Sequence, residues 1–149
     1  LINNAGTFGV AGSSFAARAE DYLDVFQVNV MGPLELIRTC LPYLEKSKSP
    51  IVANVTSKMG SIADNTSGEY GPYRVSKAAL NMLNKNIAIE NPRLISLVLH
   101  PGWVQTRMGG KQAPLLPHES VAGMLNVIDE ATVKSSGKFF DYSGAEIPW

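Results

Sequence analysis

A tyrosine and a lysine four residues apart, Tyr73 and Lys77, are the first pair of side chains in this sequence that could perform chemistry. A helix is predicted around them, because Pro72 suits a first turn and an apolar face recurs at Val75, Ala79, Met82, Leu83 and Ile87. Residues four apart share one side of a helix, so the ammonium favours the phenolate and lowers the tyrosine pKa from its reference of about 10. The pair could form an acid that works near neutral pH. It could also be a solvated lysine beside a half-buried tyrosine.

Hydroxyl side chains follow a second predicted element. Ile51-Val52-Ala53-Asn54-Val55, after Pro50, is a largely apolar run that predicts a short buried strand. Thr56, Ser57 and Ser61 come directly after it. Chemistry in open α/β sheets gathers at the carboxyl ends of the strands, so we expect one of these serines to join the site.

The remaining elements form an alternating series. A helical pattern runs from Ala19 to Glu45, with Asn29, Gly32 and Pro33 predicting a kink or a break. The series continues with a buried strand over 94–100, a helix over about 119–131 and a short strand over 138–140. Alternation of strands and helices predicts a parallel sheet with helices on its faces.

Composition limits the class of protein. The chain has 149 residues, 45% of them hydrophobic, with 13 basic and 13 acidic side chains, so we expect one domain and neither nucleic acid nor a membrane surface as partner. Cys40 is the single cysteine, which excludes an intrachain disulfide and favours a reducing compartment. With no signal peptide and no apolar run of about 18 residues, a cytoplasmic location is expected. His100 and His118 lie apart from other ligands, so no metal site is predicted.

Five short motifs, in order along the chain, resemble the short-chain dehydrogenase/reductase family. They are Asn3-Asn4-Ala5-Gly6, Asn29 within Val28-Asn29-Val30, Ser57 after the Val55-Thr56 strand end, Tyr73-x-x-x-Lys77, and Pro101-Gly102-Trp103-Val104-Gln105-Thr106. Met59-Gly60-Ser61, the segment 100–110 and the ending Ile147-Pro148-Trp149 resemble the C-factor and sniffer-type carbonyl reductase branch.

The resemblance implies a Rossmann-like α/β fold with a doubly wound parallel sheet. The family begins with a glycine-rich turn and three strands that this sequence does not contain, so residues 1–149 are expected to be the C-terminal part of one such domain. The open edge at Asn3-Asn4 and the uncovered apolar surface lead us to expect a homo-oligomer or a marginally stable chain.

The resemblance also implies a reaction, reversible hydride transfer between NAD or NADP and a small carbonyl or alcohol substrate. Tyr73 would donate the proton, Lys77 would lower its pKa and bind the nicotinamide ribose, Ser57 would position the oxygen, and Asn29 would hold a water. The cofactor-binding residues would be Asn3, Ala5, Gly6, Tyr73, Lys77, Pro101, Gly102, Val104 and Thr106, with a mobile substrate lid over 108–117.

Two alternatives stay open at this point. Ser61 lies twelve residues before Tyr73 and Ser57 lies sixteen before it; Ser57 is preferred because it adjoins the strand, where a side chain is held more rigidly. The second alternative is a non-catalytic signalling or interaction protein on the same scaffold, which the C-factor resemblance implies.

Overall fold

Four parallel strands form one sheet in the order β1-β2-β3-β4 in the computed structural model, which describes residues 1–149. The strands are β1 (Ile2–Asn3), β2 (Ile51–Val55), β3 (Ile95–His100) and β4 (Phe139–Asp141). Each strand pairs only with its neighbours in sequence, with Ile2 opposite Ala53, Ile51 opposite Ile95 and Val98 opposite Phe139. All four carboxyl ends therefore lie at one edge of the sheet, as the alternating pattern predicts.

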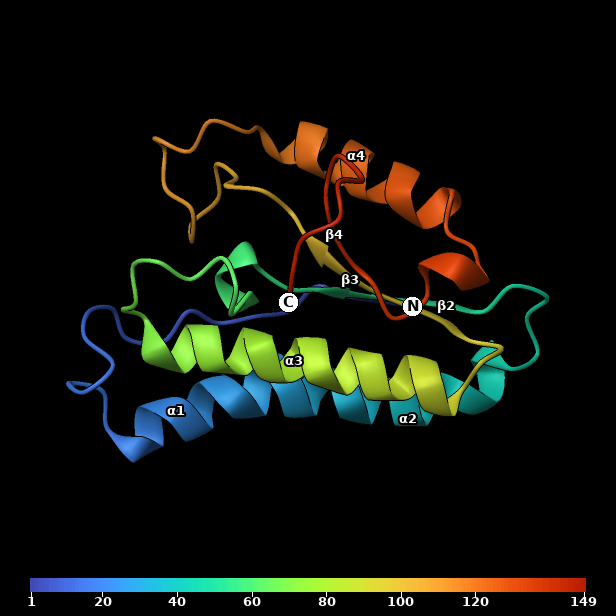
Figure 1. Ribbon diagram of the computed structural model, residues 1–149, viewed down its shortest axis with the longest axis horizontal. Helices are drawn as coiled ribbons and strands as arrows, with labels where there is room; N and C mark the ends of the chain where they lie inside the picture. The colour runs from blue at the N-terminus through green and yellow to red at the C-terminus, as the bar shows by residue number, and fades with distance from the viewer.

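Helices cover both faces of this sheet (Figure 1). The helices α1 (Ala19–Phe26), α2 (Gly32–Leu44) and α3 (Gly71–Glu90) form the layer on one face, and α4 (Pro117–Asp129) lies on the other. Two short 3-10 turns, η2 (Lys58–Gly60) and η3 (Val133–Ser135), complete the chain. The predicted α/β class and every predicted helix and strand are confirmed, with ends shifted by a few residues.

The apolar core has two main clusters, one on each side of the sheet, and a smaller third one of Val98, Phe139 and Ile147. Ile37, Val52, Ile87 and Leu94 pack between the sheet and the layer of α2 and α3. Ala53, Ile95, Leu97 and Leu99 face α4, against Met124, Val127 and Ile128. Because β3 is buried on both faces, its sequence is largely apolar rather than alternating, with Ser96 as a buried polar exception.

The predicted kink or break near Asn29 is a π-helical turn, η1 (Gln27–Met31), which joins α1 to α2. Pro33 follows this turn at the start of α2, inside a helical run that continues from α1, where proline cannot donate a backbone hydrogen bond to the preceding turn. Asn29 is fully buried. Isolated π-helical turns inside helices are frequent at functional sites, and the turn places this amide in the interior.

The predicted apolar face of α3 is correct only in part: Ile87 is buried in the core and Leu83 packs against it, whereas Val75 and Met82 lie outside. Val75 and Met82 are 51% and 63% exposed, whereas the buried side carries Ser76, Asn81 and Asn84. The buried side combines these polar groups with Leu80 and Ile87, and the polar groups find hydrogen-bond partners on the sheet: Asn54 Nδ2 and Ser96 Oγ both donate to Asn84 Oδ1, and Thr56 Oγ1 donates to Asn81 Oδ1. We call Asn54, Thr56, Asn81, Asn84 and Ser96 the polar layer.

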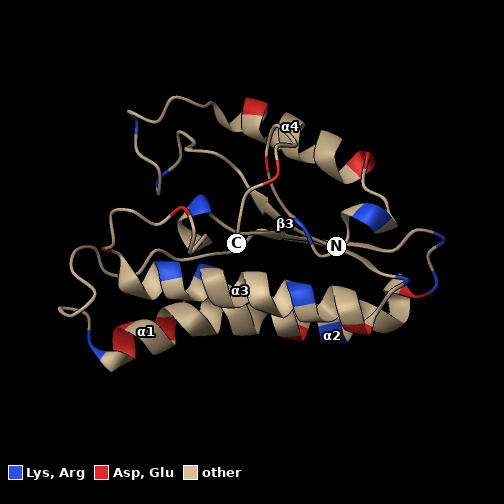
Figure 2. Cartoon of the chain, viewed as in Figure 1, with Lys and Arg blue, Asp and Glu red and all other residues tan.

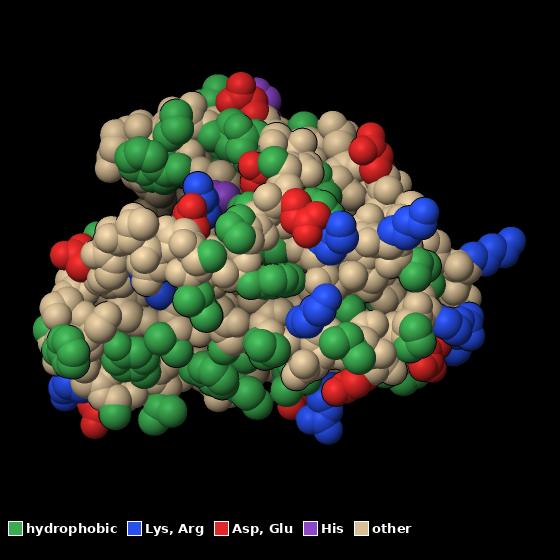
Figure 3. All heavy atoms as spheres, in the orientation of Figure 1, with side chains coloured by type: hydrophobic (Ala, Val, Ile, Leu, Met, Phe, Trp, Pro, Cys, Tyr) green, Lys and Arg blue, Asp and Glu red, His purple; other side chains and the backbone are tan.

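The surface carries mixed charge. Basic and acidic residues are scattered over the helices and loops, and neither sign gathers on one element (Figure 2). Hydrophobic side chains are numerous on the visible face over the layer of α1, α2 and α3 (Figure 3). None of the helices is long and apolar enough to cross a membrane.

Candidate active site

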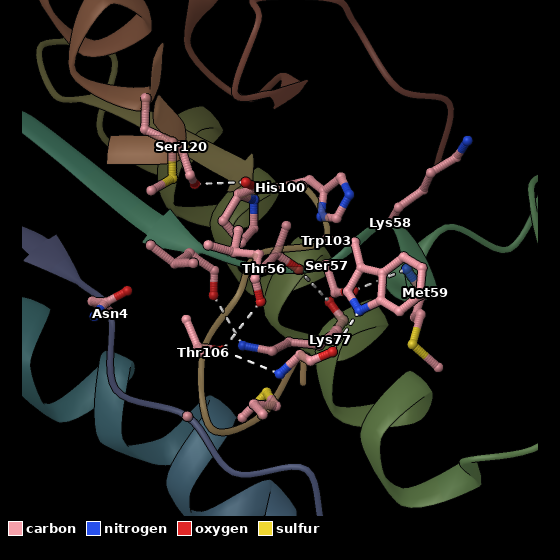
Figure 4. A pocket seen from close by; sticks show the side chains of 18 of the residues that line it. Asn4, Thr56, Ser57, Lys58, Met59, Lys77, His100, Trp103, Thr106 and Ser120 are labelled. Carbon is pink, nitrogen blue, oxygen red and sulfur yellow. Dashed lines mark hydrogen bonds between the residues drawn. The ribbon is translucent and has the colours of Figure 1, made fainter. Parts of the chain in front are cut away.

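Ser57, Tyr73 and Lys77 line one cavity of about 650 Å³ at the carboxyl edge of the sheet. Ser57 follows β2 and its Oγ accepts a hydrogen bond from the Met59 amide, which caps η2. Tyr73 and Lys77 stand in the first two turns of α3. Figure 4 shows Ser57, Lys77 and Trp103 around the same space. The structure thus brings together three side chains that are separate in sequence.

Lys77 is 4% exposed, and its Nζ donates a hydrogen bond to the carbonyl oxygen of Val55 at 2.9 Å. Burial lowers the pKa of Lys77 to about 8, because a charged group loses solvation in the interior. The ammonium is still mostly protonated at pH 7, so the cavity contains a positive charge on its wall.

Tyr73 is 7% exposed and packs against Phe8, with ring centroids 4.5 Å apart. The expectation that Lys77 lowers the tyrosine pKa is wrong for this structure. Burial raises the pKa of Tyr73, and the opposing contribution comes from a hydrogen bond with Ser57. Lys77 Nζ lies 5.7 Å from the centroid of the tyrosine ring. The phenol is therefore held in its protonated form near neutral pH.

The two candidate serines have different surroundings. The Ser57 hydroxyl faces the cavity beside Tyr73. Ser61 is 2% exposed and lies outside the cavity lining; its Oγ donates to Pro148 O at 2.6 Å and accepts from the Asp64 amide. Both hydrogen-bonding capacities of Ser61 are used by the C-terminal segment and its own loop, and this geometry favours Ser57 as the reacting group.

Asn29 does not line the cavity. Its Nδ2 donates to Thr7 O and to Ser76 Oγ, and its Oδ1 accepts from the Thr7 amide. These bonds connect η1, the loop after β1 and α3, directly behind Lys77. A Cβ placed on Gly6 would lie 3.4 Å from Asn29 Oδ1 and 3.6 Å from Lys77 Nζ. Gly6 is therefore close to both the Asn29 amide and the Lys77 ammonium, and its lack of a side chain leaves space beside them.

Only some of the residues predicted to bind the cofactor from the segment around the end of β1 line the cavity. Gly6 and its neighbour Asn4 line the cavity, whereas Asn3 and Ala5 do not. Asn3 is 5% exposed and donates through Nδ2 to Asn54 Oδ1 at 2.7 Å, so it extends the polar layer to β1. Its contacts are structural and lie behind the cavity wall.

The loop after β3 supplies the opposite wall. Pro101, Gly102, Val104 and Thr106, the residues predicted to bind the cofactor, all line the cavity. Gly102 has φ +83°, and a Cβ there would lie 2.8 Å from Leu115, so glycine is required by both conformation and space. An isolated β-bridge between Val104 and Leu115 and the bond from Trp103 Nε1 to Gly109 O hold the loop. Met108, Gly109 and Pro117 of the predicted lid also face the cavity.

His100 lines the cavity and was assigned no role from the sequence. It is the last residue of β3, and its Nδ1 is buried without a hydrogen-bond partner. Burial lowers its pKa to about 4, with Asp141 and Asp64 opposing that shift and Lys58 adding to it. The imidazole is therefore neutral at pH 7. Its position at the carboxyl end of a predicted buried strand was the sequence signal that could have identified it.

This parallel sheet with helices on both faces, and with a Tyr–Lys pair and a serine at its carboxyl edge, defines a Rossmann-like α/β domain. The family model for short chain dehydrogenase matches residues 1–115. The chain belongs to the short-chain dehydrogenase family. It is 47% identical over its whole length to C-signal of Myxococcus xanthus, of which it covers 91%, and 36% identical to a 1-hydroxy-2-glutathionyl-2-methyl-3-butene dehydrogenase of a Rhodococcus species, of which it covers 56%.

Solved structures of carbonyl reductases have the same fold as this chain. The carbonyl reductase Sniffer of D. melanogaster superposes with a TM-score of 0.94 at 34% identity, and an NADPH-bound carbonyl reductase from chicken fatty liver with a TM-score of 0.93 at 35% identity. The chain is covered completely in both cases and spans 65% of each of those chains. The predicted sniffer-type branch is confirmed, and NAD(P) is the cofactor class of the family.

Proposed function

We propose that this chain forms the catalytic part of an NAD(P)-dependent carbonyl reductase or alcohol dehydrogenase. The observation that supports this most is the meeting of Ser57, Tyr73 and Lys77 in one cavity. A nicotinamide cofactor supplies or accepts the hydride when bound. The residues of this chain orient the carbonyl, handle the proton and exclude water.

Tyr73 donates the phenolic proton to the carbonyl oxygen as the carbonyl carbon is reduced. Its raised pKa keeps that proton in place near neutral pH, and general acid catalysis of this kind typically contributes 10²–10⁴-fold. The Ser57 hydroxyl donates a hydrogen bond to the same oxygen. Lys77 supplies the nearby positive charge that stabilises the tyrosinate left after the transfer. Asn29 would position Lys77 through Gly6 and the loop after β1. Because its Nδ2 already donates to Thr7 O and Ser76 Oγ, the predicted water would bind at its remaining acceptor positions.

Several residues of this chain fit a nicotinamide cofactor. Gly6, whose missing Cβ leaves space beside Lys77 Nζ, and the loop residues Pro101, Gly102, Val104 and Thr106 line the same cavity as the Tyr–Lys pair. These residues would hold the nicotinamide end, with Lys77 on the ribose. Asn3 and Ala5 would support the wall from outside it.

The substrate is proposed to be an apolar carbonyl compound. Trp103, Met108, Val121 and Met124 line the cavity on the side of the loop and α4. Aromatic and thioether side chains around a few polar groups are typical of sites for small apolar ligands. The lone Cys40 favours a reducing compartment, and we place the protein in the cytoplasm.

The test is titration of the 149-residue chain with NADPH and NADH by calorimetry, with a carbonyl reduction assay beside it. Dinucleotide affinity comes largely from a glycine-rich turn under the pyrophosphate, so we expect this chain alone to bind no better than millimolar, about −4 kcal/mol. In a chain extended upstream of Leu1 by such a segment, Tyr73→Phe should abolish turnover and leave cofactor binding nearly intact. Tyr43→Phe, at a 71% exposed position, is the matched control. Full activity of Tyr73→Phe would contradict the proposal.

The signalling alternative is less favoured. It is supported by the name and similar length of C-signal, of which this chain covers 91%. A non-catalytic scaffold has no need of a buried lysine with a lowered pKa beside a tyrosine and a serine. Biological activity that survives Tyr73→Phe would favour the alternative.

A further inference from the structure

The loop before α3 enters the helix through three consecutive residues in the left-handed region of backbone conformation, Gly68 with φ 64° and then two residues other than glycine. Glu69 has φ 56° and Tyr70 has φ 52°. This region is sparsely populated by residues other than glycine, and two in succession need support from their surroundings. Tyr70 is the residue before α3, three positions from Tyr73. The backbone conformation of Glu69 and Tyr70 therefore determines the position of the first turn of α3, which carries the Tyr73 side chain.

Arg74 supplies that support. Its Nε donates to the carbonyl oxygens of Gly68 at 2.8 Å and Glu69 at 3.1 Å, and its Nη2 donates to Ser67 Oγ at 2.8 Å. The planar guanidinium offers five N–H donors in fixed directions. Here it binds three consecutive residues of the loop at once, from a position on the helix directly after Tyr73.

The same side chain also reaches the turn that holds Ser57. Arg74 Nη1 donates to Met59 O at 3.3 Å, and the Met59 amide donates to Ser57 Oγ at 3.1 Å. No carboxylate lies within ion-pair distance of Arg74; the four salt bridges of the chain involve other residues. The contacts therefore depend on the directions of the N–H groups rather than on neutralisation of charge.

We propose that Arg74 is a positioning residue, which fixes the Ser57 turn relative to the first turn of the Tyr73 helix and maintains the left-handed pair Glu69-Tyr70. Its effect on turnover rests on the proposed function. Its effect on the positions of Ser57 and Tyr70 does not, so the two can be tested separately.

The first measurement is amide hydrogen exchange on the 149-residue chain, comparing Arg74→Lys and Arg74→Gln with wild type. Lysine keeps the charge but loses the planar arrangement of donors, so both variants should exchange the Met59 and Tyr70 amides at least tenfold faster. The amides of β3 report global stability and should be unchanged. Arg38→Lys, at an exposed arginine paired with Glu35, is the control and should resemble wild type. Unchanged Met59 and Tyr70 exchange in Arg74→Gln would overturn the proposal.

The second measurement tests the left-handed pair. Glycine adopts positive φ without steric cost, so Glu69→Gly added to Arg74→Gln should restore slow exchange at Tyr70, whose amide donates to Gly12 O. Thr66→Gly, in the same loop at a residue without positive φ, should not restore it. Equal effects of the two glycines would overturn this part of the proposal.

The third measurement uses a catalytically active, upstream-extended form of the chain. Arg74→Lys should lower kcat about tenfold and leave the KM for NADPH within about twofold, because small misplacement of reacting groups mainly affects the chemical step. An unchanged kcat with faster Met59 exchange would overturn the catalytic consequence. If wild type itself shows no turnover, the proposed function fails, and the exchange results alone decide the role of Arg74.

Discussion

The Lys77 ammonium donates a hydrogen bond to the carbonyl oxygen of Val55 at 2.9 Å, and Val55 is the last residue of β2. This bond attaches α3 to the strand two residues before Ser57. It partly compensates the burial of a charge that the interior otherwise disfavours. Stability should therefore depend on the protonation of this one side chain.

Lys77→Met should change how stability varies with pH. The lysine pKa is about 8 in the folded chain, against 10.5 for an unperturbed lysine, so between these values the unfolded chain binds more protons than the folded one. The free energy of unfolding of wild type should then rise by about 1 kcal/mol per pH unit above pH 8, relative to Lys77→Met. Urea denaturation from pH 7 to 9.5 measures this. Lys48→Met, at an exposed lysine, should follow wild type; parallel curves for wild type and Lys77→Met would contradict the assignment.

His100 should make the chain sensitive to acid. Its pKa in the folded chain is about 4, against 6.5 for an unperturbed histidine, so between these values the unfolded chain again binds the extra proton. Stability is complete above pH 6.5 and should fall as the pH is lowered toward 4. From pH 6.5 to 5, wild type should lose about 1–2 kcal/mol more than His100→Asn. Chemical denaturation at both pH values checks this, with exposed His118→Asn as the control; identical losses in His100→Asn and wild type would count against it.

Ser57→Ala and Ser61→Ala should separate activity from stability. In an active form of the protein, Ser57→Ala removes a donor to the reacting oxygen and should lower kcat/KM about 100-fold or more. Ser61→Ala leaves Pro148 O without its donor and should cost about 1–2 kcal/mol of stability, with little effect on turnover. Steady-state kinetics and urea denaturation of both variants provide the comparison. The reverse order of kinetic effects would show Ser61 to be the catalytic serine.

The exposed side of α3 should cause self-association. Val75, Met82 and Ile89, seven residues apart, are 51%, 63% and 67% exposed, and Leu36 and Tyr43 are 50% and 71% exposed on α2. Apolar residues at this spacing form a continuous stripe on a helix. Sedimentation should detect a dimer or larger species, and Met82→Glu should reduce it. A monomeric wild type that melts cooperatively above ~60 °C would be evidence against this prediction.

The sequence alone predicts those helices and strands whose residue pattern directly reflects which side is buried. The run Ile95–His100 is largely apolar because β3 is covered on both faces, and the Tyr73–Lys77 spacing places both side chains on one side of α3 whatever surrounds them. The same reasoning placed Ser57 at the carboxyl end of β2, next to that helix.

Features that depend on distant partners could not be predicted in the same way. The Ser61 hydroxyl binds Pro148, 87 residues away, and no local pattern reveals that contact. The sequence placed Val75 and Met82 inside because they are apolar, yet Asn81 and Asn84 occupy the interior because Thr56, Asn54 and Ser96 supply partners for them. The tyrosine pKa was expected to fall because charge was considered without desolvation.

The polar layer has a consequence for ligand binding. Apolar surfaces tolerate small sliding movements, but hydrogen bonds depend on direction, and advancing α3 by one residue would move it about 1.5 Å and rotate it by about 100°. Asn81 and Asn84 would then be buried without partners, at a cost of about 1–3 kcal/mol for each group. Helix α3 is therefore pre-organised, which reduces the binding free energy that a ligand at Tyr73 and Lys77 would lose in ordering them.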